Sequence, residues 1–177
     1  MQPTRWLVDH QHFLPRAGTA LDVACGRGRN AIWLAQRGLE TLAIDRDAAA
    51  LEDLRRTADA LGLSLKTEAI DLEGGDRRLP TAGADVVVVV HYLHRLLFPG
   101  LIEALRPGGV LVYETFTQAQ AARGKPTNPA FLLAPGELRT LVAPLELLVE
   151  REGDFEGKML ASVIARRPRA PQRRPAP

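Results

Sequence analysis

Short apolar runs alternate along the chain with segments in which apolar residues recur every three or four positions. The runs predict strands at residues 20–24, 39–44, 63–70, 85–90 and 110–115. Between them, the periodic segments predict helices at 29–37, 48–61 and 99–106. Strands that alternate with helices predict right-handed crossovers and a parallel sheet with helices on both faces.

The end of the chain breaks this alternation. Residues 145–150 and 159–165 are two apolar runs separated only by 151–158, which is too short to hold a crossover helix. We expect these two runs to pair as an antiparallel hairpin. The predicted fold class is therefore α/β: a doubly wound, mostly parallel, seven-stranded sheet of Rossmann-like type that ends in an antiparallel hairpin.

The turn after the first strand, residues 24–28, contains two glycines and almost no bulk. Gly26 and Gly28 allow the backbone to turn sharply and to approach a ligand. The helix that follows presents unpaired N–H groups at its start. Asp45 ends the second strand seventeen residues after Gly28, where a carboxylate can accept hydrogen bonds from both hydroxyls of a ribose. The pattern predicts a site for a cofactor that contains a nucleoside.

Two classes of cofactor use this layout. A dinucleotide fingerprint continues as Gly-x-Gly-x-x-Gly, and Ala31 at its third position is compatible with that pattern. Asp22 inside the first strand favours the other class, because a pyrophosphate gains nothing from a further negative charge. An ammonium group near Asp22 would form a charge-assisted bond worth roughly 1.5–3 kcal/mol. An NAD-dependent oxidoreductase remains the alternative.

These residues resemble the first motif of the class I S-adenosylmethionine-dependent methyltransferases, which reads acidic-x-Gly-x-Gly-x-Gly. The matching positions are Asp22, Ala24, Gly26, Gly28 and Asn30. The resemblance implies S-adenosyl-L-methionine as the cofactor, with all five positions at its site. In it, Asp22 orients the turn and the methionine end, Gly26 and Gly28 admit the cofactor, and Asp45 holds the ribose, with Arg46 next to it.

Further cofactor contacts are expected after the third and fourth strands. Asp71-Leu72 resembles the third motif of the family, in which the acid meets the adenine amino group and the next backbone group meets the ring. A turn-capping acid is the alternative for Asp71. His91 follows the fourth strand directly and is expected beside the methionine part of the cofactor. There it is either a catalytic base at neutral pH or a polar wall.

The acceptor is expected on the same edge of the sheet. Tyr92, Phe116 and the segment 6–13, which includes Trp6, are expected to line it. The stretch 116–133 is long, mostly irregular and rich in glycine and proline. Uncovered stretches of this length are often lids, so we expect this one to close over the acceptor.

The chain also resembles a group of small bacterial methyltransferases described as tellurite-resistance-like. The resemblance extends over about 18–166 and is carried by the segments 105–109, 113–116 and 135–138. Members that modify tellurite have a longer connection with a His-Arg pair between their last two strands, whereas 151–158 has Arg151 and no histidine. This resemblance implies a small-molecule acceptor, such as a thiol or chalcogen species. A non-catalytic protein that binds S-adenosylmethionine is the alternative.

Charge separates the body of the chain from its end. The net charge is +2, but five of the 23 basic residues are arginines in the proline-rich segment 166–177. The remainder has 18 basic against 21 acidic residues, which offers no electrostatic basis for specific nucleic-acid binding. We expect an N-terminal segment at 1–17 that covers the acceptor site, a methyltransferase domain at 18–166 and a disordered tail at 167–177.

The remaining composition excludes several classes of protein. Cys25 is the only cysteine, so no intrachain disulfide forms and a reducing compartment is consistent. No apolar run approaches 18 residues and no leader pattern is present, so we expect a cytoplasmic protein, either monomer or homodimer, without a membrane partner. The spacing of His10, His12, His91 and His94 predicts no metal, because no cysteine pair supports it.

Overall fold

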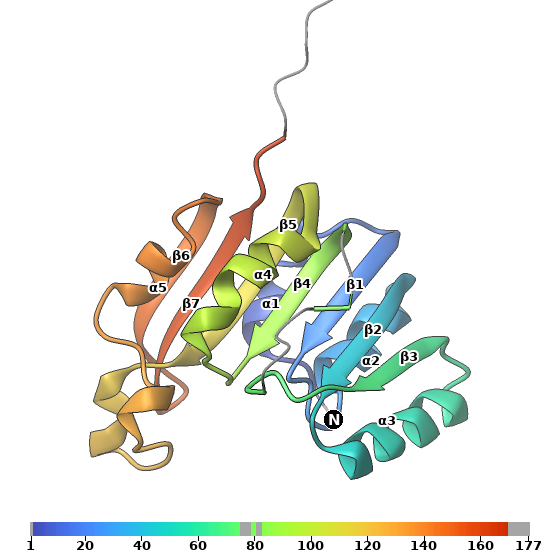
Figure 1. Cartoon of the computed structure of the whole chain (residues 1–177), viewed down its shortest axis with the longest axis horizontal. Helices are drawn as coiled ribbons and strands as arrows, with labels where there is room; N and C mark the ends of the chain where they lie inside the picture. Colours follow the sequence, from blue (N-terminus) through green and yellow to red (C-terminus); the bar gives the residue numbers. More distant parts are fainter. Residues whose placement is uncertain (1, 75–78, 81–82, 170–177) are drawn as a thin grey trace, which may run out of the picture.

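The computed structural model describes residues 2–74, 79–80 and 83–169. Its centre is a seven-stranded sheet with the strand order β3-β2-β1-β4-β5-β7-β6 (Figure 1). The first five strands run parallel, and β7 lies antiparallel between β5 and β6. The strands are β1 (Gly18–Val23), β2 (Leu39–Asp45), β3 (Leu65–Ala69), β4 (Ala84–Val90), β5 (Leu105–Phe116), β6 (Glu146–Phe155) and β7 (Lys158–Arg166). The predicted fold class is confirmed.

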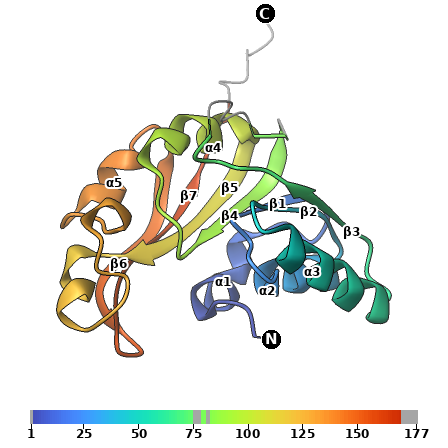
Figure 2. The same cartoon turned by 60° about the horizontal axis from the view of Figure 1, so that its bottom comes forward.

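Helices cover both faces of this sheet, with α1, α2 and α3 on one side and α4 and α5 on the other (Figure 2). The α-helices are α1 (Arg5–Asp9), α2 (Arg29–Gln36), α3 (Ala48–Ala60), α4 (Phe98–Ala104) and α5 (Glu137–Leu141). Short 3-10 helices join them: η1 (Gln11–Phe13), η2 (Arg95–Leu97), η3 (Gln118–Ala122) and η4 (Pro129–Phe131).

The valine run of β4 forms the middle of the core. Because successive side chains of a strand point to opposite faces, Val86 and Val88 pack in a cluster with α1 and α2, while Val87 and Val89 pack in one with α4 and α5. All four valines are fully buried. A strand that is apolar on both faces is typical of the centre of a doubly wound sheet.

Two element boundaries differ from the prediction. The Pro107-Gly108-Gly109 turn lies inside β5, which begins at Leu105, and the pairing of β4 with β5 shifts register before Val86. The hairpin strands are longer than predicted, so only Glu156 and Gly157 connect β6 to β7. Both residues have a left-handed backbone conformation, as a type I′ two-residue hairpin turn requires. The second half of β6, an edge strand, is mostly polar. Because it contains no apolar run, the hydrophobic pattern did not predict it.

Arg167, the first residue of the segment predicted to be a disordered tail, forms hydrogen bonds to the domain. The backbone of Arg167 exchanges hydrogen bonds with Gly108 and Gly109. Its guanidinium donates to the carbonyl oxygens of Ile102, Glu103 and Leu105 at the end of α4. Arg167 is therefore part of the domain, and the rest of the predicted tail, from 170 on, lies outside the described residues.

Replacing Arg167 with glutamine is expected to destabilise the domain by about 1 kcal/mol, because the last carbonyls of α4 lose a charged donor that is partly exposed to water. For a chain of this size, that loss corresponds to a drop in Tm of about 2–4 °C in thermal unfolding followed by circular dichroism. Arg16→Gln, at an exposed position, is the matched control. Equal melting temperatures for the two variants would contradict this role.

Candidate functional site

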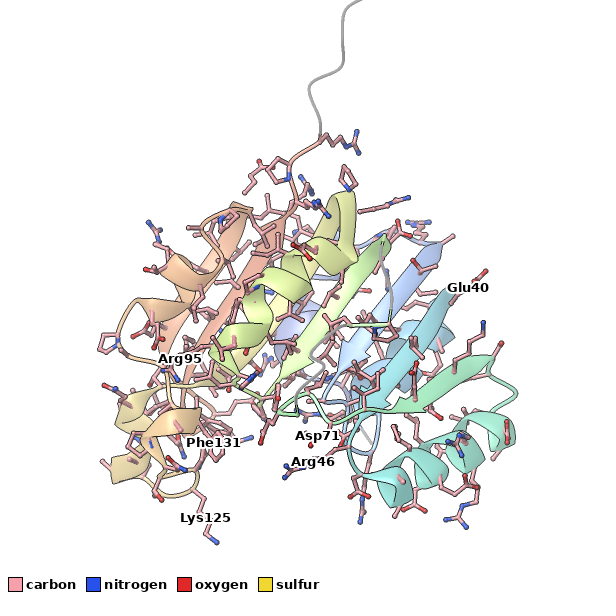
Figure 3. The ribbon with its side chains drawn as sticks, in the orientation of Figure 1. Glu40, Arg46, Asp71, Arg95, Lys125 and Phe131 are labelled. Carbon is pink, nitrogen blue, oxygen red and sulfur yellow. The ribbon has the colours of Figure 1, made fainter. Side chains whose placement is uncertain are left out.

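The carboxyl ends of the parallel strands form the rim of a cleft of about 340 Å³, called the first cleft below. Figure 3 labels three of its lining residues: Arg46 and Asp71 lie near each other at this edge of the sheet, and Phe131 lies further to the left of the view. The lining residues come from the loops after β1, β2, β3 and β4 and from the segment 116–133. They are Ala24, Asp45, Arg46, Ile70, Asp71, Leu72, Glu73, His91, Tyr92, Leu93, Phe116, Pro126 and Phe131.

The turn after β1 is held against the end of β2. The amide of Gly26 donates to Asp45 Oδ2 at 2.7 Å, and Ala24 and Gly26 both have left-handed backbones. A left-handed alanine is uncommon and is found where the surrounding structure imposes it, often at ligand sites. A Cβ atom on Gly26 would meet nothing within 4 Å. The backbone of this turn is therefore open to a ligand.

The carboxylate of Asp45 is oriented by two backbone donors. Besides Gly26, the amide of Asp47 donates to Asp45 Oδ1 at 2.9 Å. Asp47 itself caps α3 by accepting from Ala49 and Ala50. Each oxygen of Asp45 keeps a lone pair, and the residue lines the first cleft, so its side chain can accept further hydrogen bonds there.

Of the five motif residues, Ala24 is among those that line the first cleft, and the other four are not. A Cβ atom on Gly28 would lie 2.4 Å from both δ-carbons of Leu54, so this glycine is required by the packing of α3 against the turn. Asn30 is buried and accepts a hydrogen bond from the amide of Thr4 at 2.9 Å. These two residues support the turn, and the cofactor contact that the resemblance implies for them stays a prediction.

Asp22 lies beneath the same turn, with 1% of its surface exposed. Burial raises the pKa of its carboxyl group to about 7. Among the described residues, Asp22 Oδ2 has no hydrogen-bond partner. A buried acceptor without a partner is costly, and a cationic group near the turn would relieve that cost. Burial also raises the pKa of the nearby Cys25 thiol well above its usual range, which disfavours its thiolate form.

The loop after β3 supplies the opposite wall of the first cleft. Asp71 Oδ1 accepts from the amide of Glu73 at 3.0 Å, so Asp71 caps a turn and lines the first cleft at once. Arg46 lies 3.7 Å from Glu73 across the rim. Leu72 is buried in the core and shows only part of its surface to the first cleft.

His91 and Phe116 stand at the inner end of the first cleft. His91 has a left-handed backbone, and its ring stacks on Phe116 with centroids 4.7 Å apart. Burial, together with the charges of Lys158 and Arg29, lowers the pKa of His91 to about 4. The ring is therefore uncharged at neutral pH. Beside it, the Tyr92 hydroxyl has no partner among the described residues, and burial raises its pKa to about 12.

A second cleft of about 520 Å³ lies between the N-terminal segment and the hairpin of β6 and β7. His91 lines both clefts. The other residues of the second cleft are mostly polar: Gln2, Pro3, Thr4, Arg5, Asp9, Arg29, Glu114, Arg151, Asp154, Phe155, Glu156, Lys158 and Leu160.

Glu114 is a buried carboxylate in the floor of the second cleft, and sequence reasoning missed it. It accepts from Thr4 Oγ1 at 2.7 Å, from Ser162 Oγ at 2.8 Å and from Arg151 Nη2 at 3.0 Å. Its sequence signals are a charge inside an otherwise apolar strand and its place in the segment 113–116, which helps to carry the tellurite-resistance-like resemblance. Its partners come from the N-terminal segment, β6 and β7, so no local pattern could identify them.

Residues 20–109 match the family model of a methyltransferase domain. The chain belongs to this family. As a class I methyltransferase, it uses S-adenosylmethionine as its cofactor, and the family match sets aside the dinucleotide alternative. The search among curated proteins finds no match. None of the helices in the described ranges is long and apolar enough to cross a membrane.

Solved methyltransferase structures share the fold. TehB from Haemophilus influenzae has a TM-score of 0.78 and 21% identity, over 91% of this chain and 61% of that chain. An S-adenosylmethionine-dependent methyltransferase from Mesorhizobium loti has a TM-score of 0.72 and 18% identity, over 90% of this chain and 96% of that chain. One from Methanosarcina mazei has a TM-score of 0.74 and 18% identity, over 96% and 100%. At these identities, the likeness concerns the fold.

Trp6 lies in the core of this methyltransferase and lines neither cleft. Its ring is 3% exposed, and its Nε1 donates to the carbonyl of Val163 at 3.2 Å. The Arg151 guanidinium lies 4.5 Å from the ring centroid and separates it from the second cleft. Other residues of the N-terminal segment, such as Arg5, do line the second cleft. The described part of the N-terminal segment, 2–17, is thus packed against the rest of the domain.

The segment 116–133 borders the first cleft through Phe116, Pro126 and Phe131. It contains η3 and η4, so it is less irregular than predicted. Arg95 holds its far end, because its guanidinium donates to the carbonyls of Ala130 at 3.0 Å and Leu132 at 2.9 Å. Phe131 remains 44% exposed at the rim.

Proposed function

We propose that this methyltransferase acts on a small molecule whose nucleophile is a thiol or a species of a chalcogen heavier than oxygen. The observation that carries the proposal is the position of His91, whose half-buried ring lines both clefts and stacks on Phe116. Burial and the charges of Lys158 and Arg29 lower the pKa of this ring, so it is a poor proton acceptor at neutral pH. Oxygen and nitrogen acceptors usually require a base, whereas a thiol with a pKa near 8.5 is already a few per cent thiolate at pH 7.

The same proposal assigns the cofactor to the first cleft. Asp45 would accept the ribose hydroxyls, and the open backbone at Ala24 and Gly26 would lie against the cofactor. Asp71 and the backbone of Leu72 would meet the adenine, with Arg46 along the rim. The buried, partnerless oxygen of Asp22 supports a cationic group near the turn, as the ammonium of a methionine moiety would be. The donor set therefore fits S-adenosylmethionine.

In this arrangement, His91 is a polar wall and no base. When bound, S-adenosylmethionine supplies a methyl group on a sulfonium, which is already an activated leaving group. The protein must align the thiolate with the methyl carbon at about 3–3.5 Å and exclude water. His91, which lines both clefts, and Phe116, whose ring stacks on it from the first cleft, are proposed to do so.

The experiment is a screen of thiols, chalcogen oxyanions and small phenols for incorporation of labelled methyl from S-adenosylmethionine. Transfer to thiols is expected. Its kcat/KM should rise with pH between 6.5 and 8.5 with the ionisation of the thiol, because His91 stays uncharged over this range. An inflection that belongs to the enzyme near pH 6.5 would contradict the role of His91. Cofactor binding without transfer to any acceptor would support the non-catalytic alternative.

Phe116→Ala is expected to lower kcat/KM for a thiol about tenfold or more, because the acceptor loses its alignment. Cofactor affinity, measured by calorimetric titration with S-adenosylhomocysteine, should stay within about twofold. Phe131→Ala, at the exposed rim of the first cleft, is the matched control and should change kcat/KM less. A loss of 3–5 kcal/mol in stability, as for a core phenylalanine, or a loss of cofactor binding would exclude the acceptor role.

A further inference from the structure

The carboxylates of the second cleft are paired with arginines. Each of its four carboxylates lies within 4 Å of a guanidinium. The pairs are Asp9–Arg5 at 3.5 Å, Glu156–Arg5 at 3.3 Å, Glu114–Arg151 at 3.0 Å and Asp154–Arg123 at 2.5 Å. Asp9 and Glu156 share Arg5, so the four carboxylates are held by three guanidinium groups.

Two further cations line the second cleft, Arg29 and Lys158. Among the described residues, neither forms an ion pair. They come from different elements, since Arg29 is the first residue of α2 and Lys158 is the first residue of β7. Besides burial, the charges of both lower the pKa of His91, and the charge of Glu114 raises it. Two cations without an ion-pair partner among the described residues therefore line the second cleft.

The carboxylate of a bound cofactor is an alternative ionic partner for Arg29. Arg29 directly follows the turn that borders the first cleft, so a carboxylate on the cofactor lies within reach of its long side chain. Lys158 is on the opposite side, at the end of the hairpin, and lines only the second cleft. A substitution of Lys158 therefore tests binding of the acceptor. A substitution of Arg29 would not separate an effect on the acceptor from an effect on the cofactor.

We infer that the second cleft binds the methyl acceptor, and that the acceptor is a small organic thiol that also carries a carboxylate, held by Lys158 and Arg29. The inference rests on the proposed function. A volume of about 520 Å³ far exceeds that of an inorganic oxyanion, since a water molecule takes about 30 Å³ in the liquid. In the reaction, the thiolate sulfur forms a bond to the methyl carbon. The bond from that carbon to the sulfonium breaks, its electron pair stays on the leaving sulfur, and the thiol proton goes to solvent.

The test compares 3-mercaptopropionate with 3-mercaptopropan-1-ol, which match in length and thiol position and differ in charge. With the wild-type enzyme, kcat/KM for the acid is expected to exceed that for the alcohol about tenfold, as one charge-assisted bond would produce. Lys158→Gln should lower the ratio of the two values toward one, because Arg29 alone is left to hold the carboxylate. Lys125→Gln is the matched control, because Lys125 points outward from the molecule in Figure 3, and it should keep the ratio of the wild type.

Equal kcat/KM values for the two thiols in the wild type would overturn this inference and leave the proposed function intact. If neither thiol is methylated, the thiol proposal itself is wrong, and binding then decides the inference. For this purpose, 3-mercaptopropionate is titrated into protein saturated with S-adenosylhomocysteine and followed by NMR. Binding that is weakened in Lys158→Gln but not in Lys125→Gln supports the anion site. Equal binding by both variants overturns it.

Discussion

Asp45→Ala is expected to raise the Kd for S-adenosylhomocysteine about ten- to a hundredfold, which corresponds to roughly 1.5–3 kcal/mol. The side chain would lose two ribose hydroxyls as donors. It would also release the amide of Gly26, which it holds at 2.7 Å, so the turn that borders the cofactor would lose its support. Calorimetric titration measures the effect directly.

Two variants separate binding from folding in this experiment. Asp47→Ala removes the neighbouring carboxylate, which caps α3 and does not line the first cleft. It should cost about 0.5–2 kcal/mol of stability with the Kd nearly unchanged. Asp45→Asn keeps one acceptor oxygen and should fall between wild type and Asp45→Ala. An unchanged Kd in a folded Asp45→Ala protein would remove the ribose assignment.

Gly28→Ala is expected to destabilise the domain by about 2–4 kcal/mol and to lower the Tm by roughly 5–15 °C. The added Cβ would lie 2.4 Å from the δ-carbons of Leu54, so the buried Leu54 side chain, or α3 with it, must shift. The left-handed backbone adds roughly 1–2 kcal/mol of strain. Thermal or urea unfolding measures the loss.

Gly26→Ala is the matched variant, two residues away in the same turn and also left-handed. Its Cβ meets nothing in the protein, so stability should fall by only about 1–2 kcal/mol. The Kd for S-adenosylhomocysteine should instead rise at least about tenfold, because the methyl group enters the space proposed for the cofactor. If Gly28→Ala were stable and bound no cofactor, both motif glycines would face the ligand, as the sequence resemblance implies.

The glycine pair shows where sequence reasoning reaches its limit. The turn, its position after the first strand and its distance from Asp45 are local features, and the structure contains them as predicted. Leu54, which distinguishes the role of Gly28 from that of Gly26, lies on another helix, α3. A motif indicates that a position must be glycine. Only the folded structure shows which neighbouring atoms a side chain at that position would contact.

Fewer residues of the second cleft, the proposed acceptor site, could be predicted from the sequence. The sequence suggested Trp6 as an acceptor residue, and its indole is buried in the core. Glu114 and Arg151 line the second cleft and were not proposed as site residues. Their contacts join residues 37 positions apart, and the contact of Glu114 with Thr4 spans 110. Periodicity detects neighbours within an element and carries no information on such pairs.

The amino-acid sequence by itself determined the class of sheet, its antiparallel end and the glycine-containing turn after the first strand, because these follow from short-range hydrophobic patterns and backbone requirements. Only the tertiary structure decided which glycine has open space at its Cβ position, where the N-terminal segment packs and which cations near His91 have no ion-pair partner among the described residues. Those properties depend on burial and on contacts between distant segments, and these exist only once the chain has folded.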